Sequence, residues 1–384
     1  MKNDSSINQI KKIFLANDEL VINWKDGSQS NLYSHWLRDH CQMPKSRNAN
    51  NGQRLFSVIS IPKNTSIEKV KQDERGDVHI QFMPENYWSI FSQEWLWRNC
   101  YNLNNHYDDR SEKNKKLWKK TSFSNGLPRV KFINFQKSDN AKLETLRSVR
   151  DVGFCIIKDA STKEGLVQSV IAELGFTRET NYGKLFEVRT EVNPNNLAYT
   201  NMGLGSHTDN PYRDPVPTVQ LLHCLESSTK GGDSVLLDGF NAAKILREES
   251  FENFENLTNN WINFRFSDEK TDLRSRVPMI EVNDNNEVIK VRYNNRSIDT
   301  INLPSEKIRP FYLAYQHWGE VIEREELKVT FQLQPGEIII FDNTRVMHAR
   351  TAFSDKGKRH LQGAYTDLDG LYSLLNILEN RNND

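Results

Sequence analysis

Alternating apolar and polar positions dominate the first hundred residues of the chain. The segments KIFLANDELVINWKDGSQSNLY, RLFSVISI and DVHIQFMPENYWSIF combine β-branched and aromatic residues with turn-forming pairs such as Asp26–Gly27. Alternation with a period of two, bounded by turn residues, predicts short strands joined by hairpins. We therefore expect a small β-rich N-terminal domain at residues 1–110.

A strongly polar stretch separates this region from the rest of the chain. Residues 104–125 contain a lysine cluster, which suits either a solvated connector or a nucleic-acid patch. Acidic residues are interspersed among the lysines, and this mixture of signs favours the connector. We place a linker at 111–125 and a second domain at 126–384.

The second domain begins with helical spacing and continues with many short strands. AKLETLRSVRDV and TKEGLVQSVIAELGF have the periodicity of helices, and GFCIIKDA reads as a buried strand. Strands are predicted in TVQLLHCL, DSVLLDGF, MIEVNDNNEVIKVRY, KVTFQLQPGEIIIFD and KRHLQGAYTDL. The helical segments FNAAKILREES and SEKIRPFYLAYQHWGEVIERE interrupt them. This pattern predicts a mostly antiparallel barrel or sandwich with helical insertions.

The charge balance narrows the choice of partner. The chain of 384 residues has 51 basic and 51 acidic side chains, so no net field attracts nucleic acid or an anionic membrane. Its four cysteines are scattered without a CxxC pair, which suits a reducing compartment. No secretory h-region or apolar run of about 20 residues is present. We expect a cytoplasmic protein that acts on a small molecule and binds neither nucleic acid nor membrane.

His207 and Asp209 form a candidate metal pair. On an extended backbone, residues two apart point to the same face, so an imidazole and a carboxylate can reach one ion. His348, just after the apolar run IIIF, offers a third ligand. Two histidines and one carboxylate leave about half of an octahedral ion's positions open, as in non-haem Fe(II) oxygenases. The alternatives are an ordinary turn pair and a zinc-dependent hydrolase that uses the same three residues.

Arg359 is a candidate anion ligand on a predicted strand. The period of two places Arg359, Leu361, Gly363 and Tyr365 on one face. A guanidinium that points into a barrel needs an anion, because an unpaired buried charge is very costly. Its planar fork suits the distal carboxylate of 2-oxoglutarate. The alternative is a surface ion pair with Asp355.

Three separate motifs carry a family resemblance. The stretches HTDNPYRDPVPTVQLLHCLESSTKGGDSVLLDGF, FDNTRVMHART and RHLQGAY, in this order, resemble the γ-butyrobetaine hydroxylase branch of the Fe(II)- and 2-oxoglutarate-dependent dioxygenases, related to the taurine dioxygenases. The resemblance covers about residues 125–375, and WLRDH at 36–40 is similar to the family's small N-terminal domain. It implies a double-stranded β-helix (jelly-roll) catalytic domain with helical insertions, mainly β.

The resemblance also implies the cofactors and their ligands. Iron would be held by His207, Asp209 and His348, and Arg359 would clamp 2-oxoglutarate, the cosubstrate that is consumed with O2. A homodimer is implied as well. Asp342 and Asn343, after the apolar strand, would orient His348 or simply cap the turn.

The N-terminal domain departs from the family pattern. There the family carries zinc on three closely spaced cysteines after WLRD and on a later histidine. In this chain only Cys41 follows WLRD, and Tyr87 stands at the later position. A structural zinc site needs a nearly complete tetrahedral set. We therefore expect no structural zinc, and we interpret His35 and His40, the possible substitutes, as surface or packing residues.

The substrate is predicted from two sets of side chains. The resemblance implies a cage of aromatic rings around a trimethylammonium group, which cannot donate hydrogen bonds and is therefore attracted to ring faces. The matching positions are Tyr182, Phe186, Tyr199 and Tyr365, which could instead be core aromatics. The anionic end would meet Asn196 and Asn295, with further donors from Asn210, Tyr212 and Arg296.

The extra guanidinium of Arg296 suits a group with three acceptor oxygens. HTDNPY together with NNR is similar to the 2-trimethylaminoethylphosphonate hydroxylases, so we expect [2-(trimethylamino)ethyl]phosphonate, hydroxylated at the carbon bonded to phosphorus. The alternative is γ-butyrobetaine, which would give L-carnitine, if Arg296 lies on the surface without contacting substrate.

Overall fold

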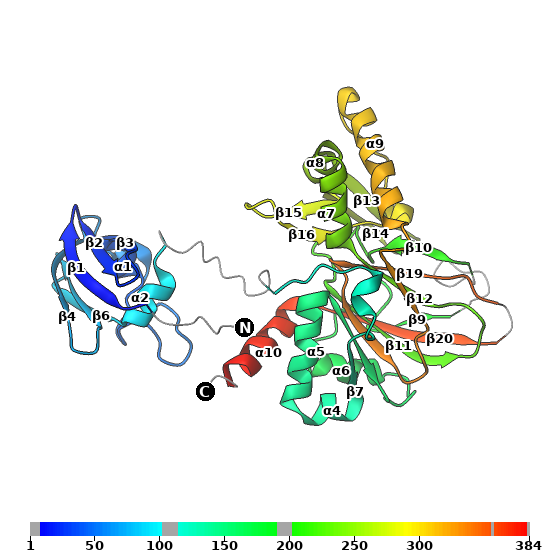
Figure 1. Cartoon of the computed structure of the whole chain (residues 1–384), viewed down its shortest axis with the longest axis horizontal. Helices are drawn as coiled ribbons and strands as arrows, with labels where there is room; N and C mark the ends of the chain where they lie inside the picture. Colours follow the sequence, from blue (N-terminus) through cyan, green and yellow to red (C-terminus); the bar gives the residue numbers. More distant parts are fainter. Residues whose placement is uncertain (1–7, 102–113, 190–201, 355–356, 382–384) are drawn as a thin grey trace. The chain divides into compact units, whose positions relative to one another are not determined.

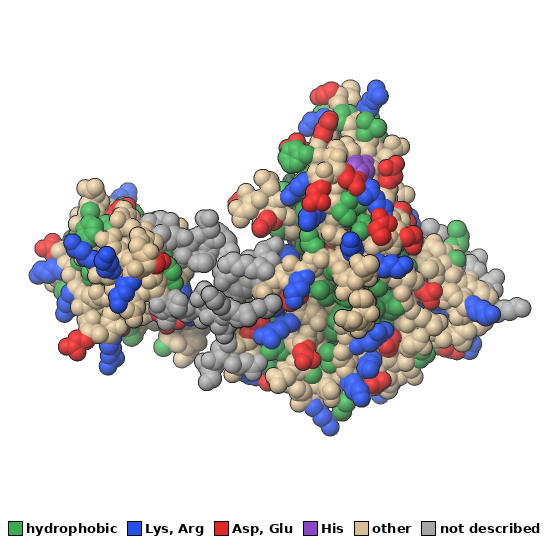
Figure 2. All heavy atoms as spheres, in the orientation of Figure 1, with side chains coloured by type: hydrophobic (Ala, Val, Ile, Leu, Met, Phe, Trp, Pro, Cys, Tyr) green, Lys and Arg blue, Asp and Glu red, His purple; other side chains and the backbone are tan. Residues whose placement is uncertain are grey.

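The computed structural model describes residues 8–101, 114–189, 202–354 and 357–381. Contacts within the chain divide it into two units, Met1–Lys113 and Asn114–Asp384 (Figure 1). Basic and acidic side chains are interspersed over the face that Figure 2 shows, in keeping with the zero net charge. No helix in the described ranges is long and apolar enough to cross a membrane.

The N-terminal unit consists of two antiparallel sheets. The first has the order β1 (Ile10–Ala16), β2 (Glu19–Trp24) and β3 (Gln29–Tyr33). The second has the order β4 (Ser66–Gln72), β5 (Val78–Met83) and β6 (Tyr87–Phe91). Two short helices accompany them, α1 (Ser34–Asp39) and α2 (Gln93–Asn99). The core contains apolar residues of both sheets and both helices, among them Leu20, Leu37, Phe82 and Leu96.

The strand expected in RLFSVISI is wrong. This segment contains a 3-10 turn, η1 (Val58–Ser60), and an isolated bridge from Arg54 to Arg47, and Ile59 is 90% exposed. It forms no strand, so alternation alone gave a false signal. The strand β4, which was not predicted, pairs with β5 instead.

A buried polar cluster occupies the place where the resemblance implies zinc. Ser89 donates a hydrogen bond to Cys41 Sγ at 3.0 Å, and Tyr87 Oη lies 3.7 Å from the same sulfur. Arg38 donates two hydrogen bonds to Glu85, each 2.8 Å long, and its guanidinium lies 4.6 Å from the centre of the Tyr87 ring. We call these residues, together with Ser46, the Cys41 cluster.

His35 and His40, the two histidines considered as substitute zinc ligands, instead make local hydrogen bonds, and His40 also stacks on a tryptophan ring. His40 stacks on Trp36 with 4.5 Å between ring centroids and hydrogen-bonds the Trp36 carbonyl. His35 hydrogen-bonds the carbonyl of Pro62 at 3.1 Å. Neither belongs to a group of potential metal ligands among the described residues.

The second unit contains two facing sheets. A six-stranded sheet has the order β7 (Arg129–Lys131), β8 (Phe154–Lys158), β18 (Ile338–Asp342), β11 (Val219–Ser227), β20 (Arg359–Thr366) and β9 (Phe186–Val188). A four-stranded sheet has the order β10 (Leu204–His207), β19 (Val346–Arg350), β12 (Ser234–Asp238) and β17 (Lys328–Phe331). Apolar side chains of both sheets, such as Phe341 and Leu236, pack together. The predicted double-stranded β-helix is confirmed.

Helices cover the sheets from outside. The six-stranded sheet packs against α4 (Phe132–Lys137), α5 (Asp139–Val152), α6 (Leu166–Ala172) and α10 (Leu368–Arg381). Between β12 and β17 the chain forms an insertion of α7 (Gly239–Glu249), α8 (Phe251–Asn259) and α9 (Ser305–Ile322). Its strands pair as β13 (Ile262–Ser267) with β14 (Asp272–Val277), and β15 (Ile280–Val282) with β16 (Val288–Val291).

Part of the expected linker belongs to the second unit. Within 111–125, Trp118 is buried, donates its backbone N–H to Asp238 at 3.0 Å and packs edge-on against Phe154. The 3-10 turn η2 (Lys120–Phe123) follows it. The charge pattern could not reveal this because a single large aromatic residue anchors an otherwise polar segment.

Candidate active site

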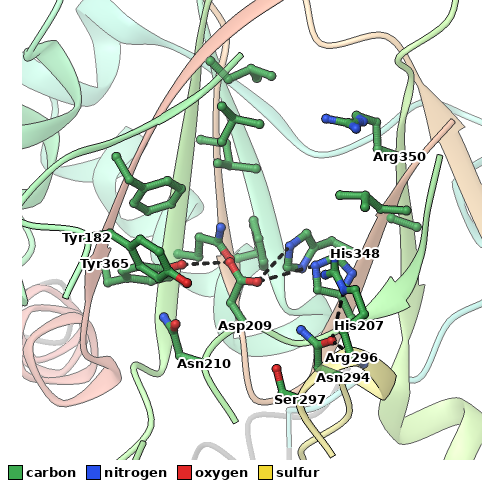
Figure 3. A pocket seen from close by; sticks show the side chains of 18 of the residues that line it. Tyr182, His207, Asp209, Asn210, Asn294, Arg296, Ser297, His348, Arg350 and Tyr365 are labelled. Atoms are coloured by element: carbon green, nitrogen blue, oxygen red, sulfur yellow. Dashed lines mark hydrogen bonds and ion pairs between the residues drawn. The ribbon is translucent and has the colours of Figure 1, made fainter. Parts of the chain in front are cut away.

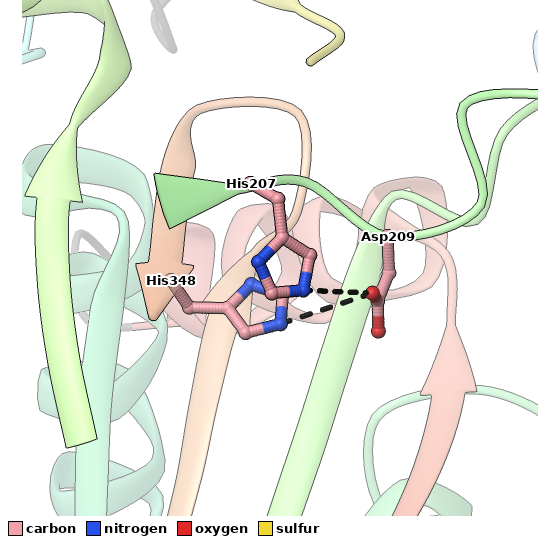
Figure 4. Close-up of side chains that lie close together, drawn as sticks. All are labelled: His207, Asp209 and His348. Atoms are coloured by element: carbon pink, nitrogen blue, oxygen red, sulfur yellow. Dashed lines mark ion pairs between the residues drawn. The ribbon is translucent and has the colours of Figure 1, made fainter. Parts of the chain in front are cut away.

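The three predicted metal ligands come together on two neighbouring strands. His207 ends β10, His348 lies on β19, and the two are direct cross-strand partners. Their ring centroids are 4.3 Å apart. Asp209 follows β10, and its carboxylate points toward both rings (Figure 4). Antiparallel pairing thus places residues that are distant in the sequence within reach of one ion.

The donor set fits an iron ion. Oδ1 of Asp209 lies 3.5 Å from His207 Nε2 and 3.8 Å from His348 Nε2. In the described ranges, this is the only group of three or more histidine, cysteine or acidic side chains whose ligand atoms are close enough to share a metal, all within 4.8 Å of one another. Two imidazole nitrogens and one carboxylate oxygen are the facial set of non-haem Fe(II) oxygenases.

Neighbouring groups fix these side chains. Nδ1 of His207 donates to the Gly205 carbonyl at 2.8 Å, which leaves Nε2 for a metal. Asn343 holds the backbone of Asp209 by accepting from its N–H at 2.7 Å and donating to its carbonyl at 2.9 Å. Tyr365 donates its hydroxyl to Asp209 Oδ2 at 2.8 Å. Oδ1 therefore faces the histidines while Oδ2 is held by the tyrosine.

Of the two roles expected of Asp342 and Asn343, capping the turn is found for Asp342, whereas neither residue is hydrogen-bonded to His348 in the described structure. Asn343 orients Asp209 rather than His348. Asp342 caps the turn, because its carboxylate accepts the backbone N–H of Thr344 at 2.8 Å and its hydroxyl at 2.6 Å. Nδ1 of His348 is buried without a hydrogen-bond partner in the described structure.

Burial and neighbouring charges set the ionisation of the ligands. Burial favours the neutral form of Asp209, but its interactions with His207 and His348 and the hydrogen bond from Tyr365 outweigh burial and lower the pKa of this carboxyl. Burial, reinforced by His207, lowers the pKa of His348 to about 3. Asp209 is therefore ionised and His348 neutral near pH 7, which are the forms that bind metal ions.

Arg359 lies at the start of β20 and lines the same cavity of about 460 Å³ as the metal triad. Burial lowers the pKa of Arg359 to about 10, and its Nε donates to the Gly232 carbonyl at 3.1 Å. Gly232 has a φ of 71°, and a side chain there would come within 2.9 Å of Arg359 Cδ. Asp355, the alternative partner, lies outside the described residues.

A second arginine, Arg350, which was not predicted from the sequence, also lines this cavity (Figure 3). It stands two positions after His348 on β19, so the period of two places both on one face. Its Nη2 donates to the Met202 carbonyl at 2.6 Å, and its guanidinium lies 4.9 Å from the centre of the Phe353 ring. The rule that identified Arg359 would also have identified Arg350.

Aromatic rings form one wall of the cavity. Phe186 stacks on Tyr365 with 5.0 Å between centroids, and Tyr182 lies 6.5 Å from Phe186. Phe266 on β13, which the sequence did not indicate, lies 5.9 Å from Tyr182 and stacks on Tyr212 at 5.2 Å. The structure thus brings the described cage residues together and adds a ring from the insertion.

Polar groups from three segments also line the cavity. Asn210 is buried, its Oδ1 accepts the Tyr212 hydroxyl at 2.8 Å, and its Nδ2 has no hydrogen-bond partner among the described residues. Arg296 is exposed to solvent at this wall, and its Nε donates to Asn294 at 3.3 Å. Ser297 adds a hydroxyl (Figure 3). The cavity therefore offers both an unpaired amide donor and a guanidinium.

One predicted substrate residue lies away from this arrangement, and two others fall outside the described residues. Asn295 is exposed, hydrogen-bonds Tyr315 of α9 and does not line the cavity. Asn294, the residue just before the 3-10 turn η4 (Asn295–Ser297), lines the cavity instead. Asn196 and Tyr199 lie outside the described residues.

Comparisons with known proteins place the chain in a family. Residues 119–365 match the family described as taurine catabolism dioxygenase TauD, TfdA family. Residues 13–97 match the family described as gamma-butyrobetaine hydroxylase-like, N-terminal.

Three curated relatives cover almost the whole chain. The gamma-butyrobetaine dioxygenase of Homo sapiens is 31% identical, covering 94% of this chain and 95% of that protein. The enzyme of the same name from Pseudomonas sp. (strain AK-1) is 30% identical, covering 93% of each. A trimethyllysine dioxygenase of Meyerozyma guilliermondii is 29% identical, covering 96% of each.

The chain belongs to the TauD/TfdA family. It is a dioxygenase that binds Fe(II) and consumes 2-oxoglutarate. Its family membership and its metal triad both support this assignment. The predicted family, enzyme class and cofactors are confirmed, and the zinc-dependent hydrolase is set aside because the family and the relatives are dioxygenases.

Proposed function

We propose that this enzyme hydroxylates a small zwitterion with a trimethylammonium group at one end and an anion at the other. The observation that carries the proposal is one cavity beside the metal triad that is lined both by aromatic rings and by polar donors. Tyr182, Phe186 and Tyr365 contribute the rings, called here the aromatic wall, and Asn210 and Arg296 contribute the donors, called here the polar wall. Holding both ends of a substrate is what makes a strong oxidant selective for one carbon.

The aromatic wall suits a quaternary ammonium. Such a cation cannot donate hydrogen bonds, and ring faces attract it by their quadrupole. Phe186 and Tyr365 stack on each other, Tyr182 lies tilted beside Phe186, and all three rings line the cavity. The three relatives named above act, by their names, on trimethylammonium compounds.

The polar wall supports the phosphonate as the first candidate substrate. The buried Nδ2 of Asn210 has no partner, and Arg296 adds a forked donor in the same cavity. A buried donor left unpaired is costly, so a bound anion would stabilise it. A guanidinium, a carboxamide and the Ser297 hydroxyl together match three acceptor oxygens better than two. We therefore propose [2-(trimethylamino)ethyl]phosphonate, hydroxylated at the carbon bonded to phosphorus.

A second candidate, γ-butyrobetaine, is favoured by the relatives. Two of the three named above are gamma-butyrobetaine dioxygenases. Arg296 is exposed to solvent, so it can also turn away from a carboxylate that needs only Asn210 and Asn294. In this case the product would be L-carnitine.

Each residue has a part in the proposed reaction. His207, Asp209 and His348 would hold the iron, and Arg359 would hold the distal carboxylate of 2-oxoglutarate. When bound, iron and cosubstrate supply the oxidising power that inserts an oxygen atom from O2 into a C–H bond. Tyr365 has two contacts, because its hydroxyl fixes Asp209 and its ring packs on Phe186. It would therefore set the distance between iron and substrate.

The test is 2-oxoglutarate consumption in air by the iron-loaded enzyme, with the phosphonate, γ-butyrobetaine and trimethyllysine in parallel. Strong stimulation by the phosphonate supports the first candidate, and preferential stimulation by the betaine supports the second. Preference for trimethyllysine would show that the polar wall recognises an amino-acid head group. Silence with all three refutes the proposal.

A matched pair of variants assigns Arg296. Arg296→Met should raise KM for the phosphonate by about 10–100-fold, the value of charge-assisted hydrogen bonds, and change KM for the betaine far less. The control is Arg274→Met, which removes an exposed arginine that pairs with Asp272 and does not line the cavity. Equal effects of Arg296→Met on both substrates would favour γ-butyrobetaine.

A cytoplasmic location and a homodimer stay predictions.

A further inference from the structure

The ring of Phe186 fills the space of a missing side chain on the neighbouring strand. Phe186 and Gly363 are cross-strand partners in the pairing of β9 with β20. A Cβ added to Gly363 would overlap three carbons of the Phe186 ring, of which the most distant is only 2.8 Å away. Real Cβ atoms do not make contacts this close. The ring can occupy its position only because residue 363 is glycine.

The neighbouring side chains leave the Phe186 ring one direction in which to move, which is toward the cavity. On the face of β20 that lines the cavity, Leu361 precedes Gly363 and Tyr365 follows it. Tyr365 already stacks on Phe186 at 5.0 Å, and Val188 of β9 also lines the cavity. A methyl group at 363 would therefore lift the ring away from the sheet and into the cavity.

The opposite face of β9 is held by polar contacts. Glu187 points away from the cavity and hydrogen-bonds His360, while Gln362 donates its amide to the other carboxylate oxygen at 2.8 Å. Gln362 in turn accepts the backbone N–H of Gly165 at 2.6 Å, just before α6. The three-residue strand β9 has β20 as its sheet neighbour, so these contacts fix where Phe186 stands.

We propose that Gly363 is a specificity-determining residue that sets the width of the trimethylammonium cage, and that Glu187 is a positioning residue for the same wall. The inference rests on the proposed function, because it assigns the dimension of that site. Glycine lets the Phe186 ring lie back against β20, which leaves room for three methyl groups. A larger residue at 363 would narrow the cage and favour a smaller ammonium.

The experiment measures the preference for methylation state. Wild-type enzyme and Gly363→Ala are given the best trimethylammonium substrate and its dimethylammonium counterpart, and KM and kcat are read from 2-oxoglutarate consumption. Gly363→Ala should raise KM for the trimethylammonium compound by roughly tenfold, the scale of a lost cation–π contact. KM for the dimethylammonium compound should change by less than about threefold. Gly319→Ala, a helix position with free space around it, is the matched control.

A double-mutant cycle shows whether the effect passes through the ring. Phe186→Leu shortens the side chain that the new methyl group would meet. Adding Gly363→Ala to Phe186→Leu should therefore change KM much less than adding it to the wild type. Purely additive effects would overturn the proposal, as would an equal loss with both amines. Calorimetric binding of the trimethylammonium compound should show the same non-additivity.

A second variant tests the positioning role. Glu187→Ala should raise KM for the trimethylammonium compound by several-fold with kcat nearly unchanged, because it loosens a wall and leaves the iron ligands intact. Glu173→Ala, which removes an exposed partner of Lys142, is the control. A fall in kcat with unchanged KM would refute the positioning role of Glu187.

If the wild type responds to no trimethylammonium compound, the proposed function itself fails. If the wild type prefers three methyl groups and Gly363→Ala keeps that preference, the inference alone fails.

Discussion

Two buried polar clusters of this protein, one in each unit, contrast in how their side chains are satisfied. In the Cys41 cluster, Ser89, Tyr87 and Glu85 serve as partners for Cys41 and Arg38. Nη1 of Arg38 has no hydrogen-bond partner, but the guanidinium lies over the rings of Phe56 and Tyr87. Almost every group is used inside the cluster.

The cavity of the second unit behaves in the opposite way. Asn210 Nδ2 is buried without a partner, and the Nε2 atoms of His207 and His348 face one carboxylate oxygen at distances longer than hydrogen bonds. Buried polar groups in proteins are normally paired, so unused donors and ligands require an explanation. The difference separates a cluster that stabilises the fold from one that is built for ligands. Five predictions test this separation.

The largest effect is expected at the metal site. Asp209→Ala removes the ligand that faces both histidines and should lower 2-oxoglutarate turnover by more than about 100-fold, beyond the range that changes around a metal site reach. Asp284→Ala, an exposed aspartate in a hairpin, should leave turnover unchanged. Iron binding measured by equilibrium dialysis should fall in parallel. Full activity of Asp209→Ala would refute the metal assignment.

Next in size is the loss of the ion pair between the buried Arg38 and Glu85, whose side chain is 23% exposed. Arg38→Met should destabilise the N-terminal unit by about 2 kcal/mol, the value of hydrogen bonds to a charged group. Hydrogen exchange of the β5 amides in the full chain measures this local stability. Arg98→Met removes an exposed pair with Glu94 and should cost at most about 0.5 kcal/mol. Equal effects of the two variants would mean that the Cys41 cluster is not structural.

Asn343→Ala should have an intermediate effect. It releases the backbone of Asp209 but removes no ligand, so iron affinity should fall by about 10–100-fold. The KM for 2-oxoglutarate should change little, because Arg359 lies on a different strand. An unchanged iron affinity would show that the Asp209 backbone is rigid without Asn343.

A smaller effect is expected for Tyr87→Phe. The change removes the hydroxyl that contacts Ser46 at 3.2 Å and keeps the ring under Arg38. The N-terminal unit should lose about 1 kcal/mol, the net value of an ordinary hydrogen bond. Turnover should not change. A loss as large as that of Arg38→Met would contradict the assignment of the main contribution to the charged pair.

The smallest effect is expected on the stability of the N-terminal unit, which should not change when metal ions are removed. Chelation of divalent metals should abolish turnover while hydrogen exchange of β5 stays the same, because Cys41 and Tyr87 cannot supply a tetrahedral zinc set. Reloading with Fe(II) should restore turnover. Faster exchange of β5 after chelation would reveal a metal in the N-terminal unit and overturn the expectation that it folds without zinc.

The sequence was most informative where a simple period applies. His207 with Asp209, and Arg359 with Tyr365, were found because alternate residues of a strand share a face. Arg350 follows from the same rule applied to His348.

The remaining site residues depend on contacts that no local pattern records. Phe266 reaches the cavity because β13 of the insertion packs beside Tyr212. Asn294 rather than Asn295 faces inward because η4 begins with a tight turn, and a shift of one residue there reverses the two side chains. The false strand at 54–61 shows the same limit, since alternation does not supply a partner strand.

The position of β20 has a consequence for how the protein is made. It is the last strand of the chain, yet it lies inside the six-stranded sheet between β11 and β9. While the ribosome is still adding these residues, the edge of β11 stays open and β9 has no neighbour, a state that invites association with other chains. Arg359 and Tyr365 arrive on this same strand. The six-stranded sheet and the face that carries these two residues are therefore completed only after residues 359–366 have been added to the nascent chain.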